Sequence, residues 1–515
     1  MTMVPAPVHE DLFEAVHGGD EDAVVRLLRS GAPAEATDED GGTALYTAAV
    51  AGRAGIVRLL LAAGADPGRG SGEGGGELPL CGAACHGRTE VVRALLAAGA
   101  WPDEREEFGF TALAWAVRQG YADTVRVLLE YGADAGAPGP DGAVPLVAAA
   151  RRGSVPVVRA LLERGAPGRE EALAEARAWL GRDVEGFLRE ALEESYGVGV
   201  ETVVRRIPEE GGVTVVVEVL RGGVPVAGRE QQTGHAAIAT LLEVASGERP
   251  PFDEVAGRAL RCGDPSLDDW VEAAEALGRR GDEETFVAAA AWCGGGEPLR
   301  QAFGAEVLAR LTASGSGRAG VFAARAVPVL RELAREVREA DVVLAVVRAL
   351  GAQGDASVLP DVLRHAVHPD ARVRRGVAVA VTGLVPEGHR EGVAALVALA
   401  RDGDAGVRAA AVHALAVGQD DSPTVRGALA ARLEDRSPDP LVAAEAARGL
   451  AVRQDVRAVP ALEALLVSAD PDGRAYAVAL GALEHVRDGS LRRRLESALP
   501  RRRAGAGRSG PRPVR

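Results

Sequence analysis

A pattern of small and apolar residues recurs along the first third of the chain with a near-constant period. One copy contains Ile56-Val57-Arg58-Leu59-Leu60, whose apolar residues share a face of a helix, followed by Gly64-Ala65. The same step recurs every 33 to 35 residues, at Gly31-Ala32, Gly64-Ala65, Gly99-Ala100, Gly132-Ala133 and Gly165-Ala166. A period of this length indicates one unit copied in tandem, each copy burying its apolar face only against its neighbours. The pattern therefore predicts an elongated helical stack with a long exposed surface.

Residues around each Gly-Ala step make this period specific. The second copy contains Asp38-Glu-Asp-Gly-Gly-Thr43-Ala-Leu45 before its first helix and Gly64-Ala65-Asp66 at its end. This arrangement resembles the ankyrin repeat, whose consensus is D-x-x-G-x-T-P-L-H-x-A-A, a glycine-bounded turn, V-V-x-x-L-L and G-A-D. The resemblance covers roughly residues 8–170, and Ala172–Leu192 resembles a degenerate sixth copy. It implies pairs of short helices joined by finger-like turns, and each glycine suits a left-handed helix end.

Runs of β-branched residues interrupt the helical pattern after the last copy. Residues 200–207 and 213–220 are both rich in valine and other β-branched residues, and a Glu-Glu-Gly-Gly turn separates them. These features predict a β-hairpin, and Val224-Pro225-Val226 adds a short third strand before the helical pattern resumes at Thr233. We expect this segment to cover the end of the helical stack and join it to the next part.

A second periodic pattern occupies the C-terminal half. Asp370-Ala-Arg-Val373-Arg374 recurs as Asp404-Ala-Gly-Val407-Arg408, and more weakly at Asp439 and Asp472. The pattern resembles HEAT repeats in their short bacterial form, with D-x-x-V-R in one helix and A-V-P-x-L-x-x-L-L in the next, so a bacterial protein is expected. In that family the aspartate caps the helix and the arginine ties one layer to the next. Ala443 stands at the arginine position after Asp439.

Together these patterns predict a mainly α fold made of tandem α-solenoids, with a small β-hairpin or meander at the junction. The expected divisions are an ankyrin-repeat domain (8–195), a β-rich junction (196–235), a HEAT-repeat domain (236–498) and a disordered basic tail (499–515).

The composition leaves the predicted fold unchanged and indicates the cellular compartment in which the protein is expected. Hydrophobic residues make up 47% of the chain, which excludes wholesale disorder, and no window approaches 18 consecutive apolar residues. The first residues lack the basic and apolar regions of a signal peptide. The four cysteines are too few for a disulfide framework. We therefore expect a cytoplasmic protein without a membrane span.

Charge and residue usage exclude several classes of activity. The chain contains no lysine, so all 59 basic residues are arginine. Without lysine there is no phosphate-loop lysine and no Schiff-base nucleophile, which argues against ATPase, kinase and pyridoxal chemistry. The net charge of −15 opposes nucleic-acid coating, although residues 491–515 carry nine arginines and one glutamate.

No cofactor, metal or catalytic site can be nominated. Cys81, Cys85 and His86 have no second ligand pair at zinc-site spacing, and Cys81 stands at a packing position, so we interpret it as a core thiol. Gly70-x-Gly72-x-x-Gly75 matches a dinucleotide-binding pattern but follows no strand. We therefore expect no cofactor, no metal and no enzymatic activity.

The ankyrin resemblance implies that partner contacts come from finger tips and from the exposed ends of the first helices. Phe108 and Phe110 attract most interest because two aromatic rings beside dense charge resemble an interaction hot spot. Alternatively, one or both rings pack against the next finger. The predicted contact residues are Glu39, Asp40, His86, Glu107, Phe108, Phe110, Arg118, Gln119, Arg151 and Arg152.

The sequence thus favours a non-catalytic scaffold or adaptor that binds one or more partner proteins through the ankyrin fingers and the HEAT concave surface, and that acts as a monomer. An alternative is a nucleic-acid-associated protein that uses the basic tail and the HEAT surface. A third class, HEAT-type lyases and DNA glycosylases, requires a carboxylate or chromophore cysteine that nothing in the sequence singles out.

Overall fold

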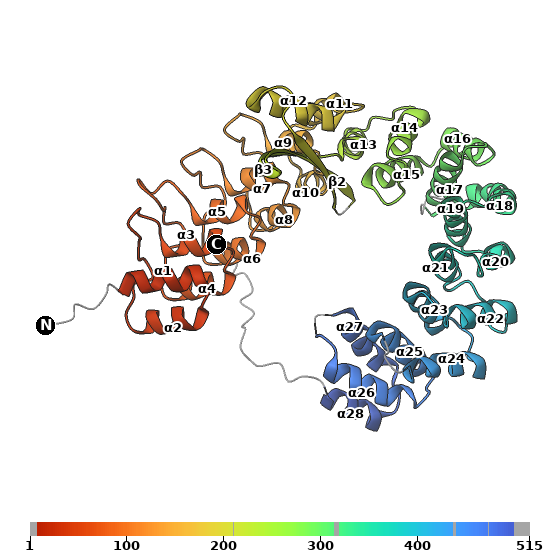
Figure 1. The fold of residues 1–515 in the computed structure, drawn as a ribbon. Helices are drawn as coiled ribbons and strands as arrows, with labels where there is room; N and C mark the ends of the chain where they lie inside the picture. Colours follow the sequence, from red (N-terminus) through yellow and green to blue (C-terminus); the bar gives the residue numbers. More distant parts are fainter. Residues whose placement is uncertain (1–7, 210, 314–318, 436–438, 472, 499–515) are drawn as a thin grey trace, which may run out of the picture. The chain divides into compact units, whose positions relative to one another are not determined.

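A computed structural model of the chain describes residues 8–209, 211–313, 319–435, 439–471 and 473–498. The chain divides into two compact units, Met1–Ala276 (unit 1) and Leu277–Arg515 (unit 2). Both are mainly helical, and a three-stranded sheet lies in unit 1 (Figure 1). The predicted fold class is therefore confirmed. The predicted basic tail, residues 499–515, lies outside the described residues.

Within its described residues, unit 1 begins with successive pairs of short helices, one pair for each copy of the sequence pattern (Figure 1). The pairs are α1 (Val8–Gly18) with α2 (Glu21–Arg29), α3 (Ala44–Val50) with α4 (Ala54–Ala62), α5 (Pro79–Cys85) with α6 (Thr89–Ala97), α7 (Ala112–Gln119) with α8 (Ala122–Glu130), and α9 (Pro145–Arg152) with α10 (Val155–Glu163). The glycine after the second helix has a left-handed conformation, as at Gly99 (φ +102°) and Gly132 (φ +91°). This agrees with the helix end predicted from the sequence.

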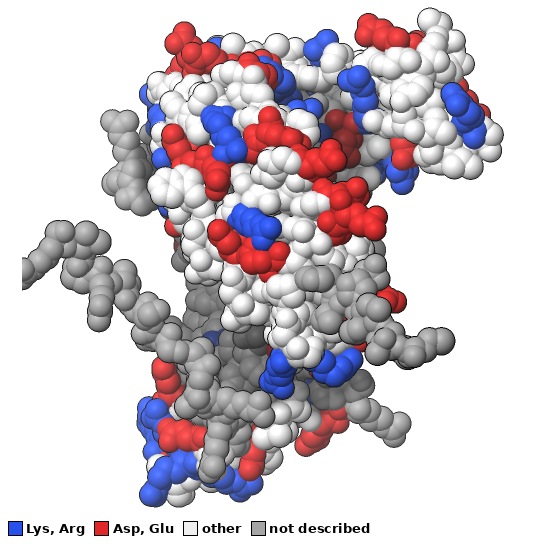
Figure 2. Space-filling model, turned by 90° about the vertical axis from the view of Figure 1, so that its left-hand side faces the viewer, with Lys and Arg blue, Asp and Glu red and all other residues white. Residues whose placement is uncertain are grey.

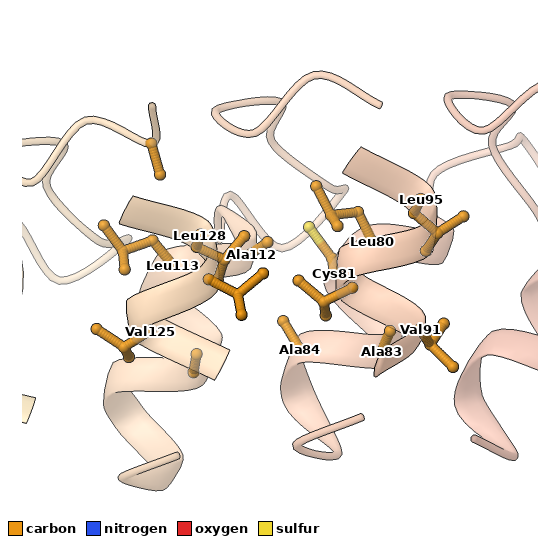
Figure 3. Close-up of a cluster of buried hydrophobic side chains, with 14 of the residues drawn as sticks. Leu80, Cys81, Ala83, Ala84, Val91, Leu95, Ala112, Leu113, Val125 and Leu128 are labelled. Carbon is orange, nitrogen blue, oxygen red and sulfur yellow. The ribbon is translucent and has the colours of Figure 1, made fainter. Parts of the chain in front are cut away.

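Small and branched apolar side chains fill the space between successive pairs (Figure 3). Ala83 of α5 and Ala112 of α7 are fully buried, so these first helices can pack closely together. Leu95 of α6 and Leu128 of α8 are also fully buried. Each such leucine stabilises the stack by about 1.5–3 kcal/mol relative to an exposed one. The core is therefore continuous from repeat to repeat.

Hydrogen bonds hold the fingers between the pairs. In the second repeat the Thr43 hydroxyl caps α3 by accepting from the Tyr46 amide at 3.1 Å. The amide of Thr43 donates to the hydroxyl of Ser71 in the next finger at 2.9 Å. One finger is therefore tied both to its own helix and to its neighbour.

A sheet follows the last helices of the stack. Helices α11 (Arg169–Ala178) and α12 (Val184–Tyr196) precede strands β1 (Thr202–Glu209), β2 (Gly212–Arg221) and β3 (Val224–Gln232). The sheet is antiparallel in the order β1-β2-β3. Val215, Val217 and Val219 of β2 pack with Leu188 and Leu192 of α12. The meander predicted for the junction is present, and its third strand extends to Gln232, well beyond the predicted Val226.

Unit 1 continues past residue 235, where the HEAT domain was expected to begin. Helix α13 (His235–Ser246) packs against α9, α10 and α11 and is followed by α14 (Phe252–Cys262) and α15 (Asp268–Arg280). Helix α13 belongs to unit 1 because it is buried on nearly all sides; its buried residues include Ala237, Ile238 and Leu242. A helix with so much apolar surface needs neighbours on several sides, and the end of the ankyrin stack provides them.

Unit 2 consists of two layers of helices. Helices α17, α19, α21, α23, α25 and α27 contact one another in sequence, and intervening helices pack beside them. Its elements are α16 (Glu283–Cys293), α17 (Pro298–Ala313), α18 (Ala319–Glu336), α19 (Ala340–Gly351), η1 (Ala356–Val358), α20 (Leu359–Leu363), α21 (Ala371–Ala380), α22 (Arg390–Leu399), α23 (Ala405–Val417), α24 (Pro423–Leu433), α25 (Pro440–Val452), α26 (Ala458–Ser468), α27 (Arg474–Ala482), η2 (Leu483–His485) and α28 (Gly489–Ala498).

The recurring aspartates of unit 2 cap helices as expected, and of the two arginines Arg374 alone ties one repeat to the next. Asp370 and Asp404 cap α21 and α23 by accepting backbone N–H groups. The guanidinium of Arg374 bridges to the Asp402 carboxylate of the next repeat at 2.7 and 2.8 Å. Arg408 instead donates to backbone oxygens of the turn before its own helix. These residues stabilise the stack, so we do not count them as candidates for partner binding.

Candidate protein-binding groove

A groove of about 660 Å³ lies between the fourth and fifth repeats of unit 1. Helices α7 and α9 and the finger before α9 form its walls, and Gln231 of β3 lies at one edge. Most of the lining is apolar, from Phe110, Ala114, Val117, Pro140, Ala143, Pro145 and Ala148. The charged side chains in the lining are Arg118, Asp141, Arg151 and Arg152. An apolar floor with a few charged groups is typical of a site that recognises a partner.

The structure brings four of the predicted contact residues together in this groove: Phe110, Arg118, Arg151 and Arg152. The others do not line it. Glu39, Asp40, His86, Glu107 and Phe108 are exposed on other parts of the repeats, and Gln119 is half-buried. The predicted set therefore divides into groove residues and residues of the outer finger edge.

An aromatic and cationic stack forms one wall of the groove. The rings of Phe110 and Trp115 stack with centroids 4.1 Å apart and an interplanar angle of 23°. The guanidinium carbon of Arg118 lies 5.4 Å from the Phe110 centroid and 5.9 Å from that of Trp115. Arg118 forms no ion pair with another described residue, so its charge is available to a ligand.

Trp115 is a residue of this wall that the sequence analysis missed. Its indole N–H donates to a carboxylate oxygen of Glu106 at 2.9 Å. Burial raises the pKa of Glu106, this hydrogen bond lowers it, and the neighbouring charges of Glu107 and Glu77 raise it further. The useful signal was the three-residue spacing of Trp115 and Arg118, which places both on one helical face.

The two phenylalanines proposed as a hot spot have different surroundings. Phe108 is 62% exposed, whereas Phe110 is half-buried against Trp115. The alternative considered for the sequence was that one or both rings pack against the next finger; Phe110 does pack, but its ring stacks on Trp115. Its partner is a residue of its own repeat, because α7 presents Trp115 directly after the finger that carries Phe110.

Arg151 and Arg152 are both engaged within unit 1, but to different degrees. Arg151 is exposed and lies 3.1 Å from Asp141 and 2.9 Å from Glu175. The side chain of Arg152 is only 14% exposed; it pairs with Glu230 of β3 and donates to the Gln119 carbonyl. The sheet therefore covers Arg152, and we leave it out of the proposed contact surface.

The sheet and α13 are fixed to the end of α9 beside the groove. The Gln231 side-chain amide donates to the carbonyl oxygens of Arg151 and Arg152 at 2.9 and 2.6 Å. His235 stacks on Trp179 with centroids 4.7 Å apart, and its Nε2 lies 3.3 Å from the Arg151 carbonyl oxygen. These contacts hold the backbone of α9 that carries the groove arginines.

Acidification is expected to loosen this attachment through His235. Burial lowers the pKa of His235 to about 4 in the folded protein. The unfolded chain takes up the proton near its ordinary value of 6.5, so stability that is complete above this pH is lost as the pH falls toward 4. The loss amounts to about 3 kcal/mol at about 1.4 kcal/mol for each pKa unit. Hydrogen exchange of the α13 amides at pH 7 and 4.5 measures it.

The control is His235→Gln, which cannot ionise and should show a smaller loss between these two pH values. Asp269 titrates in the same range with the opposite sign, because burial raises its pKa to about 6. Since Asp269 is present in both proteins, their difference isolates His235. Equal pH dependence of the two proteins would contradict the assignment.

The outer finger edge is acidic. Figure 2 shows acidic side chains gathered in several clusters on the side of the molecule that it presents, with fewer basic ones between them. Exposed Glu39, Asp40 and Glu107 belong to the fingers of unit 1. Asp38 is different, since one of its carboxylate oxygens accepts from the Asp40 and Gly42 amides and shapes its finger. His86 is also partly engaged, with Nδ1 2.9 Å from the Gly82 carbonyl oxygen.

The cysteine and glycine motifs have structural positions. Cys81 is 1% exposed, its Sγ lies 3.8 Å from the Phe110 carbonyl oxygen, and burial raises its pKa. Gly70-x-Gly72-x-x-Gly75 lies in a finger closed by paired backbone hydrogen bonds between Ser71 and Glu77.

Among the described residues there is no group of three or more His, Cys, Asp or Glu side chains able to hold a metal ion. None of the helices in the described part of the chain is long and apolar enough to cross a membrane.

The two units define a protein built from helical repeats. Comparison with family models identifies the repeats: ankyrin repeats match residues 12–106 and 80–171, and HEAT repeats match residues 327–416 and 393–484. The chain therefore combines ankyrin repeats toward its N-terminus with HEAT repeats toward its C-terminus. A comparison with curated proteins gave no match.

Proposed function

We propose that this protein is a non-catalytic adaptor that holds a partner protein in the groove between its fourth and fifth ankyrin repeats. The observation that carries the proposal is Arg118, whose unpaired guanidinium lies over the Phe110 and Trp115 rings at the edge of an apolar groove. Ankyrin and HEAT repeats generally serve as protein-interaction scaffolds, which supports this choice. The HEAT surface offers a second site for the same partner or for another. A bacterial, cytoplasmic and monomeric protein is part of this proposal.

The groove favours a particular kind of partner segment. Its apolar floor suits a buried aliphatic or aromatic side chain, and Arg118 suits a carboxylate beside it. Arg151 is already balanced by Asp141 and Glu175, so it shapes the rim and adds little net charge. We therefore infer a partner segment with one large apolar residue followed or preceded by an acidic one.

Changing the groove should release the partner. In the full-length chain, Phe110→Ala together with Arg118→Glu is expected to weaken partner binding by at least about 30-fold, because a hot-spot residue contributes about 2 kcal/mol or more. The measurement is capture of partner proteins from native cell lysate with identification by mass spectrometry. Binding of the identified partner is then titrated with each purified variant.

The matched control is Phe108→Ala, which removes an exposed ring from the same finger without touching the groove lining. It should leave affinity nearly unchanged. If Phe108→Ala weakens binding as much as the groove variant does, the finger tip and not the groove holds the partner. Circular dichroism of each variant confirms that the fold is retained, and Arg118→Glu alone provides a test that leaves the Phe110 packing in place.

A further inference from the structure

A second groove lies in unit 2, on the layer of helices that runs from α17 to α27. Helices α21, α23 and α25 line it, with Arg474 of α27 at one edge, and its volume is about 470 Å³. It is hollow because α23 contributes Gly406, Ala409 and Ala410 where the helices on either side carry larger residues. On one side these include Arg375 and a 56% exposed Val379 of α21; on the other side Leu441 of α25 lines the groove.

The one acidic side chain that lines this groove is already neutralised. Glu445 is 6% exposed, and one of its carboxylate oxygens accepts from Arg448 Nη2 at 2.6 Å and from Nε at 3.0 Å. The other oxygen lies 3.0 Å from Nδ1 of His413. Both carboxylate oxygens are therefore occupied, and Glu445 does not repel an incoming anion as a free carboxylate would.

Two guanidinium groups of the lining remain without such partners. Arg375 and Arg474 are exposed, and neither forms an ion pair with another residue in the described part of the chain. They stand out in a protein whose net charge is −15. Exposed arginines beside an apolar floor provide both charge complementarity and bidentate hydrogen bonding for carboxylates.

We propose that this groove binds an extended acidic segment of a partner protein, with carboxylates on Arg375 and Arg474 and small apolar side chains over Ala409 and Ala410. Arg375 lies on α21 and Arg474 on α27, three helix spacings apart, so at about 8–10 Å for each spacing the path between them is about 24–30 Å. An extended chain covers this length with about seven to nine residues at about 3.3 Å each. A segment of that length reaches both arginines while its backbone crosses the hollow over α23.

The lining favours a peptide over a nucleic acid. None of the described residues that line the groove is Phe, Tyr or Trp, so bases find no aromatic platform on which to stack. Val379, Leu441 and the alanines instead offer contacts for aliphatic side chains. This inference rests on the proposed adaptor role of the HEAT repeats, but it does not depend on the groove of unit 1.

The test uses the full-length protein and a fluorescein-labelled peptide, Glu-Ala-Val-Ala-Ala-Val-Ala-Glu, followed by fluorescence anisotropy. Arg375→Glu with Arg474→Glu should weaken binding at least about tenfold, because both charge pairs become repulsive. Ala409→Met fills the hollow without changing charge and should also weaken binding. The control Arg335→Glu with Arg364→Glu makes the same charge change at exposed positions outside the groove and should leave affinity unchanged.

Several outcomes would overturn the proposal. One is absence of binding by the unaltered protein up to about 1 mM peptide, the range of the weakest specific complexes. Equal weakening by the control pair would show attraction by net charge alone. Tighter, groove-dependent binding of a single-stranded oligonucleotide of equal charge would favour the nucleic-acid alternative. The variant Phe110→Ala with Arg118→Glu should bind the peptide normally, so failure here and failure of the unit 1 groove are separate results.

Discussion

Replacing Glu243 with Gln is expected to lower the local free energy of unfolding around α13 and α14 by about 3–5 kcal/mol. Glu243 and Arg258 each have side chains that are 1% exposed. Arg258 donates to the two carboxylate oxygens at 2.6 and 2.8 Å and to the Thr240 hydroxyl at 2.9 Å. Glutamine cannot balance the buried guanidinium, which would keep only the 53% exposed carboxylate of Glu254 at 3.0 Å. A poorly compensated charge in the interior is among the most costly changes a protein can suffer.

The protonation of Glu243 gives the same conclusion. Burial would raise the pKa of Glu243, but the hydrogen bonds and charges of Arg258 and Arg177 outweigh burial and hold it below its ordinary value. Because the folded-state pKa is lowered, the stabilisation is present above the pKa of an unfolded glutamate and is lost as the pH falls through the folded-state value. The difference between the protein and its Glu243→Gln variant should therefore shrink in acid.

Hydrogen exchange of the α13 and α14 amides is the appropriate measurement, because a chain with two units does not unfold in one step. The control is Glu248→Gln, which removes a second carboxylate from Arg177, one that is 45% exposed and lies 2.6 Å away. An exposed pair of this kind contributes about 0–1 kcal/mol. If the two variants exchange at the same rate, Glu243 and Arg258 do not have the role assigned to them.

Replacing Arg453 with Met is expected to destabilise the C-terminal end of α23 by about 3 kcal/mol. Arg453 is 7% exposed, and its guanidinium donates to the carbonyl oxygens of Leu415, Ala416 and Gly418 at 3.1 Å or less. It also reaches the carbonyls of Gly449 and Asp420. The last carbonyls of a helix have no partner within the helix, and each one left buried and unsatisfied costs about 1–3 kcal/mol.

Two further substitutions make the Arg453 test specific. Arg453→Lys retains the charge but not the planar fork of donors, so it should recover only part of the loss. Arg457→Met removes a 48% exposed guanidinium that pairs with Asp455 at 2.6 Å, and should cost about 1 kcal/mol or less. Thermal unfolding and amide hydrogen exchange in α23 are measured for each of the three variants. A loss for Arg453→Met no larger than that for Arg457→Met would contradict the role of Arg453 as the anchor of α23.

The sequence predicted the repeats well because their information is local. The Gly-Ala steps mark successive helix pairs, and Asp370 and Asp404 cap helices where their pattern requires. The run of β-branched residues in 213–220 predicted β2. Each of these signals lies within one repeat or one hairpin, and neighbouring copies complete the packing, so periodicity alone was sufficient.

The domain boundary and the groove could be predicted only in part. The sequence identifies Phe110, Arg118 and Arg151 as residues of fingers and first-helix ends, but it does not single out Trp115. It also predicts Arg152 as a contact residue, whereas Glu230 of β3 pairs with it. The sequence predicts an ankyrin domain that ends at residue 195, a β-rich junction over 196–235 and a HEAT domain from residue 236, whereas unit 1 extends to Ala276. The unit to which α13 belongs depends on which helices bury its apolar surface, and these helices, α9, α10 and α11, lie far from it in the sequence.

By itself, the sequence determined the helical repeats and the small sheet, since the repeats depend on contacts between segments about 33 residues apart and the sheet on contacts within successive hairpins. The tertiary structure alone decided which charges pair across parts of the chain that no period relates. Arg152 meets Glu230 across 78 residues, and Arg159 meets Asp268 across 109 residues at 2.7 Å. No period relates such partners. The physical reason is that a charged side chain selects whichever opposite charge the completed fold brings within a few ångströms, and this selection leaves Arg118 and Arg375 free for a partner.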